Sequence, residues 1–175
     1  KKFLIQPVDM LGFMLLGRVA HKAAYYTIAV VPFAFVFFLC RDFFDGWPDA
    51  EVLIAFCLSL FMGFLLGFFI EASLGLVAFW FLEVSSLVFI YNLLSFFLSG
   101  HMFPLNLLPG WAYEIVKVLP FQYLAYMPAA IFLDKIPRSE LWTSLANEAC
   151  WLLVFVVLAR IMFQRGIQRY SGFGG

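Results

Sequence analysis

The chain has 175 residues, of which 65% are hydrophobic and 13% are charged, and its mean hydropathy is +0.97. A water-soluble domain of this size needs far more polar surface, so the composition excludes a soluble protein and indicates an integral membrane protein. The formal net charge of zero does not by itself indicate a partner, but no basic patch is interleaved with aromatic residues, so we expect no nucleic-acid partner.

The apolar residues form four continuous stretches, each close to the roughly 20 residues that a helix needs to cross a hydrocarbon core about 30 Å thick. These stretches do not alternate with period two, which favours helices over barrel strands. We predict an all-α integral membrane protein with spans at residues 23–40, 50–72, 74–98 and 141–164. Pro32 is expected to kink the first span.

The basic residues of the connections predict the orientation, because short loops rich in Lys and Arg favour the cytoplasm. Residues 1–22 carry four of them and the tail 165–175 carries two, whereas the connection after the first span is acidic and residues 99–140 have no basic excess. We therefore expect both ends of this chain in the cytoplasm. The chain opens with KKFLIQPVD, which has no initiator Met and no signal peptide, so we expect that upstream residues are missing.

Glu83 falls near the middle of the expected third span, where an ionised carboxylate costs at least about 2.5 kcal/mol. Ser86 lies on the same helical face, and Asn92 lies on nearly the opposite one. One interpretation makes Glu83, Ser86 and Asn92 part of a substrate or proton pathway. The alternative makes Glu83 a protonated or hydrogen-bonded packing residue and Asn92 a contact between helices.

Two further features concern the contacts between spans. Gly63 and Gly67 form a small-xxx-small pair in the second span, which permits close helix packing. Glu148, in the fourth span, needs a partner or a water-filled cavity, and the sequence does not name one. Arg160 is too far along the same helix to pair with it, and its side chain can extend to the cytoplasmic headgroups.

Catalytic and metal-binding motifs are absent from the sequence. It contains no HExxH, no GxSxG and no GxxxxGK[ST] motif, so any ATP is bound by another chain. The two histidines, His21 and His101, are expected on opposite sides of the membrane. The three cysteines are too scattered for a zinc site or a redox pair, so we expect no metal.

Residues 99–140 open with SGHMFPLNLLPGW, which combines helix-breaking residues with apolar ones. Such a segment is too apolar for an exposed loop, and non-helical backbone is tolerated near a membrane only where protein or water satisfies its polar groups. Trp111 suits the membrane interface, and Pro109 suits the first turn of a short helix. The segment therefore favours a re-entrant element on the outer side.

Three blocks of the sequence, SG..FPL..LPGW, LPFQY and RG..RYS..GG, together resemble the membrane subunit of ABC type 2 exporters, in the viologen-exporter-like branch of bacterial permeases. The resemblance covers essentially the whole chain. Permeases of this kind have six spans, with a re-entrant pair of short helices before the last one. The four spans here then correspond to the last four. The resemblance thus implies an N-terminally truncated permease in the bacterial inner membrane.

The resemblance also implies roles for particular residues. The outer re-entrant gate would include Gly100, His101, Pro104, Pro109 and Trp111. The first 22 residues would contain the segment that couples the permease to its ATPase, and the residues expected to take part in this coupling are Pro7, Asp9 and Arg18. A lipid-surface helix without a protein partner is the alternative for this segment.

The function expected from this resemblance is that of a permease subunit in an ATP-driven exporter. ATP and Mg would be bound by a partner ATPase, and a second permease subunit would complete a homodimer or heterodimer within the lipid bilayer. The substrate would be hydrophobic or amphiphilic. The runner-up is a membrane scaffold without transport activity, and an enzyme comes third.

Overall fold

The computed structural model describes residues 9–41, 46, 48–81, 83–103 and 105–169. The chain divides into two units, Lys1–Trp47 and Pro48–Gly175, and each unit is described by itself. Every regular element among the described residues is helical. This confirms the predicted all-α class.

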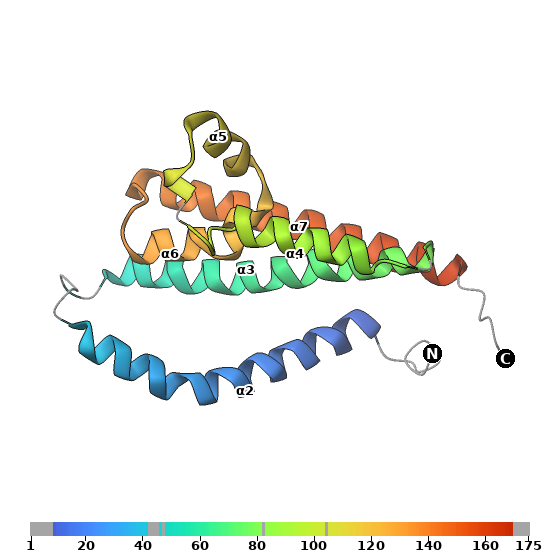
Figure 1. Cartoon of the computed structure of the whole chain (residues 1–175), viewed down its shortest axis with the longest axis horizontal. Helices are drawn as coiled ribbons and strands as arrows, with labels where there is room; N and C mark the ends of the chain where they lie inside the picture. The colour runs from blue at the N-terminus through green and yellow to red at the C-terminus, as the bar shows by residue number, and fades with distance from the viewer. Residues whose placement is uncertain (1–8, 42–45, 47, 82, 104, 170–175) are drawn as a thin grey trace. The chain divides into compact units, whose positions relative to one another are not determined.

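The described part of the first unit is formed mainly by one long helix, α2, which runs from Met10 to Leu39. Its 30 residues correspond to about 45 Å, more than the hydrocarbon core requires. We expected a separate segment at residues 1–22 and a span that begins at residue 23. The structure has no break at residue 23, because α2 continues through it. Asp9 is the N-cap, and Pro32 lies inside the helix, which is curved along its length (Figure 1).

Two long helices dominate the second unit and lie side by side (Figure 1). Helix α3, Ala50–Leu76, continues into the short 3-10 helix η2, Val77–Phe79. Helix α7 runs from Arg138 to Arg169. Within the described residues, three helices are long and apolar enough to cross a membrane, namely Met10–Leu39, Ala50–Phe79 and Arg138–Gln168. Three of the four expected spans therefore have a matching helix.

The expected span at residues 74–98 is divided in the structure. Its start belongs to the end of α3 and to η2, and its last 14 residues form α4, Ser85–Leu98. The 14 residues of α4 correspond to only about 21 Å. Only one face of α4 is covered within the second unit, with Val84, Val88, Tyr91, Ser95 and Leu98 at alternating spacings of three and four.

Residues 99–140 form short helices rather than an extended loop. They are η3, Leu105–Leu107; α5, Gly110–Val118; η4, Pro120–Leu124; and α6, Tyr126–Phe132. Pro109 is the N-cap of α5, one residue before the first helical turn that the sequence predicted for it, and Leu119 is extended before Pro120, so α5 ends there. Both η4 and α6 pack against α3, which places this part of the chain in the core of the second unit.

Candidate functional site

The packed faces of α3 and α7 repeat every three or four residues, a spacing that keeps one face of a helix toward its neighbour. On α3 the buried positions include Val52, Ala55, Ser59, Gly63, Leu66, Ile70 and Ser73. On α7 the buried or half-buried positions include Leu141, Leu145, Glu148, Leu152, Phe155 and Ala159. Small residues at three successive positions of the α3 face, 55, 59 and 63, let neighbouring backbone approach closely.

A carboxyl group lies inside this packed face. The Glu148 side chain on α7 is 0% exposed, and so is Ser59 on α3. Ser59 Oγ donates a hydrogen bond of 2.8 Å to Glu148 Oε2 and thereby links the two helices. Glu148 Oε1 is buried and has no hydrogen-bond partner within the described part of the chain. One carboxyl oxygen is thus satisfied and the other is not.

The backbone of η4 approaches α3 beside this carboxyl. A Cβ built on Gly63 would lie 2.5 Å from the Tyr123 carbonyl oxygen and 3.5 Å from Glu148 Oε1. A Cβ built on Gly67, one turn further along α3, would meet only Leu124 Cδ2 at 3.4 Å. Both glycines of the small-xxx-small pair therefore face η4, and Gly63 is the position where a side chain cannot fit.

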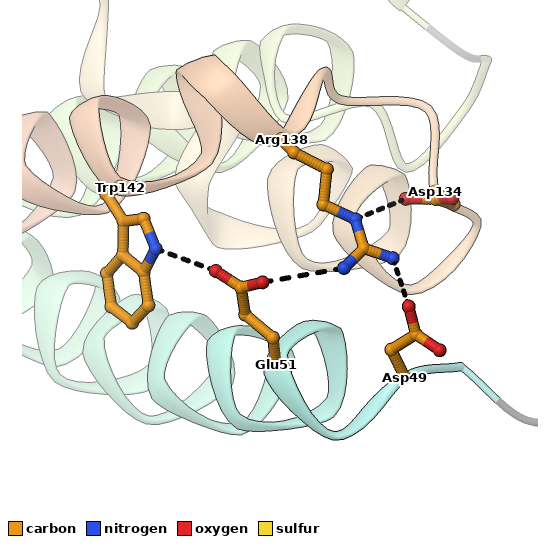
Figure 2. Close-up of polar contacts among 5 residues, drawn as sticks. All are labelled: Asp49, Glu51, Asp134, Arg138 and Trp142. Atoms are coloured by element: carbon orange, nitrogen blue, oxygen red, sulfur yellow. Dashed lines mark hydrogen bonds and ion pairs between the residues drawn. The ribbon is translucent and has the colours of Figure 1, made fainter.

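Arg138 connects the first turns of α3 and α7 (Figure 2). Its Nη2 donates to Asp49 Oδ2 at 2.6 Å, its Nη1 reaches Glu51 Oε2 at 3.5 Å, and its Nε lies 3.9 Å from Asp134 Oδ1. Trp142 Nε1 donates to the other Glu51 oxygen at 3.0 Å. The Arg138 and Asp49 side chains are 46% and 72% exposed, so solvent screens these ion pairs and each contributes little to stability.

The end of α4 turns at Gly100 and is fixed to the start of α6. Gly100 has a φ of +84°, and a Cβ there would lie 2.9 Å from Tyr126 Cβ. The Ser99 carbonyl accepts a hydrogen bond of 2.9 Å from the Tyr126 N–H. Ser99 Oγ lies 2.5 Å from His101 Nδ1, and the His101 ring stacks on Phe96. This turn therefore requires glycine at position 100.

Helix α5 is attached to the core through the segment that follows it. Gln122 is buried, and its Nε2 donates a hydrogen bond of 2.6 Å to the Lys117 carbonyl near the end of α5. Burial raises the pKa of Tyr126, and the nearby Tyr113 of α5 raises it further. The Tyr126 hydroxyl therefore stays protonated at neutral pH and can both donate and accept a hydrogen bond.

Comparison with known proteins identifies the family of this helical unit. A family model described as "ABC-2 family transporter protein" matches residues 1–174. The chain belongs to the ABC-2 transporter family. It is thus an ABC-2 type permease, a membrane subunit that works with an ABC ATPase and is not itself a catalytic enzyme. No curated protein and no solved structure matches the chain.

We expected Glu83 near the middle of one uninterrupted helix over residues 74–98. This expectation is wrong, because Glu83 does not lie in a helix. Glu83 is exposed and lies between η2 and α4, where the chain leaves the helix before it turns back. Ser86 is exposed in the first turn of α4, and Asn92 is exposed midway along it. The structure does not bring these three residues together into one polar site.

The predicted coupling residues lie at the start of the first unit of the permease. Asp9 is exposed at the N-cap of α2, and Arg18 is half-buried two turns into the same helix. Pro7 lies outside the described residues. Their role in ATPase coupling stays a prediction.

The predicted outer-gate residues fall into two groups. Gly100 and His101 belong to the turn against Tyr126, as described above. Pro109 and Trp111 begin α5, and Trp111 is 73% exposed. Pro104 lies outside the described residues. The structure therefore joins only the first group to the core of the permease.

No group of three or more His, Cys, Asp and Glu side chains that could hold a metal ion occurs among the described residues. Cys40, Cys57 and Cys150 are free thiols.

Sequence reasoning recognised that Glu148 needs a partner but did not find Ser59. The signal that links them is the repeat of each helix. Ser59 follows Val52 and Ala55 in one repeat, and Glu148 follows Leu141 and Leu145 in another, so each polar residue continues an apolar stripe. A polar residue in such a stripe predicts a contact between helices, although not which helix supplies the other group.

Proposed function

We propose that this permease is the membrane subunit of an ATP-driven exporter, in which a separate subunit hydrolyses ATP with Mg. A second permease subunit, identical or related, would complete the translocation path for a hydrophobic or amphiphilic substrate. The observation that carries the proposal is the match of the ABC-2 family model to residues 1–174. The long apolar helices support it, because they suit a membrane subunit. The sequence also contains no GxxxxGK[ST] motif, which agrees with ATP binding by a separate subunit.

The proposed coupling begins at the N-terminal end of α2. Closure of the ATPases on ATP would displace the segment with Pro7, Asp9 and Arg18, and this displacement must favour one packing of the helices over another. The continuity of α2 from Met10 to Leu39 supports this role, since a rigid helix transmits movement of one end along its whole length. In the alternative, this segment would lie on the lipid surface and would not contact an ATPase.

The proposed outer region comprises η3, α5, η4 and α6, arranged as a re-entrant element before the last span. The docking of η4 on Gly63 and the exposure of Trp111 support this assignment, because one part of the region belongs to the helical core and another faces outward. In this proposal α4 is the third span of this chain, shortened at its start, and both chain ends are cytoplasmic. Glu83 would then lie at the cytoplasmic mouth of the path, followed by Ser86 and Asn92 along α4.

The coupling proposal is tested by co-purification with the ATPase that is co-expressed with the permease. Charge reversal with Asp9→Lys and Arg18→Glu is expected to abolish recovery of the ATPase. Arg165→Glu is the matched control, since it reverses an exposed charge on α7 instead. Equal recovery with both sets of variants would exclude α2 as the coupling segment.

The exporter and the scaffold alternative differ in ATP-dependent transport. We expect the reconstituted complex to move a fluorescent lipophilic dye across proteoliposome membranes only with ATP and an active ATPase. Uptake that is the same with a hydrolysis-deficient ATPase would contradict the exporter proposal. A stable complex that transports no dye, and in which the permease does not alter ATP hydrolysis, would favour the scaffold alternative.

A further inference from the structure

Glu148 lies deep within a helix that is long enough to cross a membrane. It follows Arg138, the first residue of α7, by ten residues, which corresponds to about 15 Å, and it is about 30 Å from the other end of the helix. Both its side chain and that of Ser59 are 0% exposed. Water therefore reaches this carboxyl only if the helices around it separate, and the nearer aqueous side is the one where Arg138 lies.

The charged and titratable groups around Glu148 provide no positive charge. On the α3 side, Glu148 accepts the hydrogen bond of the Ser59 hydroxyl. On the η4 side, the titratable group near it is Tyr123. The core around them is completed by Tyr91 of α4 and by apolar side chains of α6, Met127 and Ile131. Among the described residues, no Lys, Arg or His forms an ion pair with Glu148.

A buried carboxylate without a cationic partner carries a large desolvation penalty, which a neutral carboxylic acid avoids. A metal ion would neutralise it only with more ligands than Glu148, Ser59 and one carbonyl supply, since hard cations take about six oxygens. Within the described part of the chain, no further acidic, histidine or cysteine side chains gather there. A proton meets the same need without additional ligands.

We propose that Glu148 is a proton-binding site that is linked to the packing of α3, α7 and η4. In the packed arrangement the carboxyl holds a proton and accepts the Ser59 hydrogen bond. When the three segments separate, water enters from the Arg138 side, the O–H bond of Glu148 breaks, and the proton passes to water and leaves a hydrated carboxylate. The two arrangements then bind protons unequally, so pH shifts the balance between them.

The position of Gly63 supports a separation at this point. Its missing side chain lets the Tyr123 carbonyl approach α3 next to Glu148 Oε1, so η4 covers the carboxyl with backbone rather than with interlocking side chains. Movement of η4 would therefore expose the Glu148 oxygen that has no hydrogen bond. The proton-binding site itself follows from burial, and only its use during transport rests on the proposed exporter function.

Infrared difference spectroscopy of the full-length permease in lipid nanodiscs tests the proton-binding site. The C=O band of a protonated carboxylic acid is expected at neutral pH, and it should be lost in Glu148→Gln and kept in Glu114→Gln, which changes an exposed glutamate of α5. Ser59→Ala should shift the same band to higher frequency, because the carboxyl loses a hydrogen bond while Glu148 stays in place. A spectrum in which neither Glu148→Gln nor Ser59→Ala alters a carboxylic band would overturn the proposal.

Proton release is tested separately with the permease–ATPase complex in a weakly buffered solution that contains a pH-sensitive dye. A non-hydrolysable ATP analogue is expected to release a proton from the wild type and from Glu114→Gln, and this release should be lost in Glu148→Gln. Equal release from all three proteins would overturn the link to helix separation. If the permease shows the carboxylic C=O band of Glu148 but binds no ATPase, the proton-binding site is supported and only the exporter function is contradicted.

Discussion

Ser59 and Glu148 are 89 residues apart in the sequence, and one hydrogen bond of 2.8 Å joins them between α3 and α7. Both side chains are fully buried. The contact between the two longest helices of the second unit therefore depends on a polar pair within an apolar face. Four sets of substitutions test how this pair and the neighbouring contacts stabilise the permease.

Ser59→Ala is expected to lower the free energy of unfolding by about 1 kcal/mol, because the Glu148 carboxyl loses its hydrogen-bond donor. Ser73→Ala is the matched control, since Ser73 is also buried on α3 but donates to the Phe69 carbonyl of its own helix. Unfolding in detergent micelles measures both variants. A double-mutant cycle of Ser59→Ala with Glu148→Gln should show coupling, and a cycle without coupling would mean that the pair does not stabilise the contact.

Gly63→Ala is expected to destabilise the second unit by about 1–3 kcal/mol, because the new Cβ would meet the Tyr123 carbonyl at 2.5 Å. Gly67→Ala should cost clearly less, since its Cβ meets only the flexible end of Leu124 at 3.4 Å. Thermal unfolding of the purified variants gives the comparison. Equal stability of the two variants would contradict the close approach of η4 to α3.

Gly100→Ala is expected to destabilise the turn after α4 by about 1–2 kcal/mol from its positive φ alone, and the contact with Tyr126 adds to this. Gly110→Ala should leave stability unchanged or increase it, because it lies in α5 and a Cβ there meets nothing within 4 Å. The midpoint of thermal unfolding distinguishes these outcomes. A tolerated Gly100→Ala would indicate that the turn adopts another backbone conformation.

Arg138→Gln is expected to lower the free energy of unfolding only slightly, since the ion pairs with Asp49 and Glu51 are exposed to solvent. Its effect should decrease further at high salt, which screens exposed charges. Lys135→Gln, at an exposed residue outside the network, serves as the control. Unfolding at low and high salt measures both, and a large effect of Arg138→Gln that does not depend on salt would contradict a screened surface network.

The sequence by itself determined the membrane environment, the all-α class and the family. Composition is sufficient to determine the membrane environment, because a chain with 65% hydrophobic residues cannot expose them to water. Continuous apolar stretches predicted helices, since in hydrocarbon a helix satisfies its own backbone groups. The blocks around LPGW and LPFQY indicated an ABC type 2 permease, and the family match confirms that assignment.

The sequence did not determine where the helix around Glu83 ends. Residues 74–98 are apolar on both sides of Glu83 and contain no proline, so the pattern predicted one uninterrupted span. The structure instead ends η2 at Phe79 and begins α4 at Ser85. The break leaves Glu83 between two helices, and local periodicity could not predict it because it depends on where α4 packs.

Only the tertiary structure paired Ser59 with Glu148 and placed Gly63 beneath the Tyr123 carbonyl. Each of these residues has a clear local preference, but a contact between helices depends on which helices are neighbours and on their register. Those are properties of the packed chain as a whole, since shifting one helix by a single residue turns a different face toward its neighbour. The sequence therefore determined the helices and their environment, and packing decided which buried groups meet.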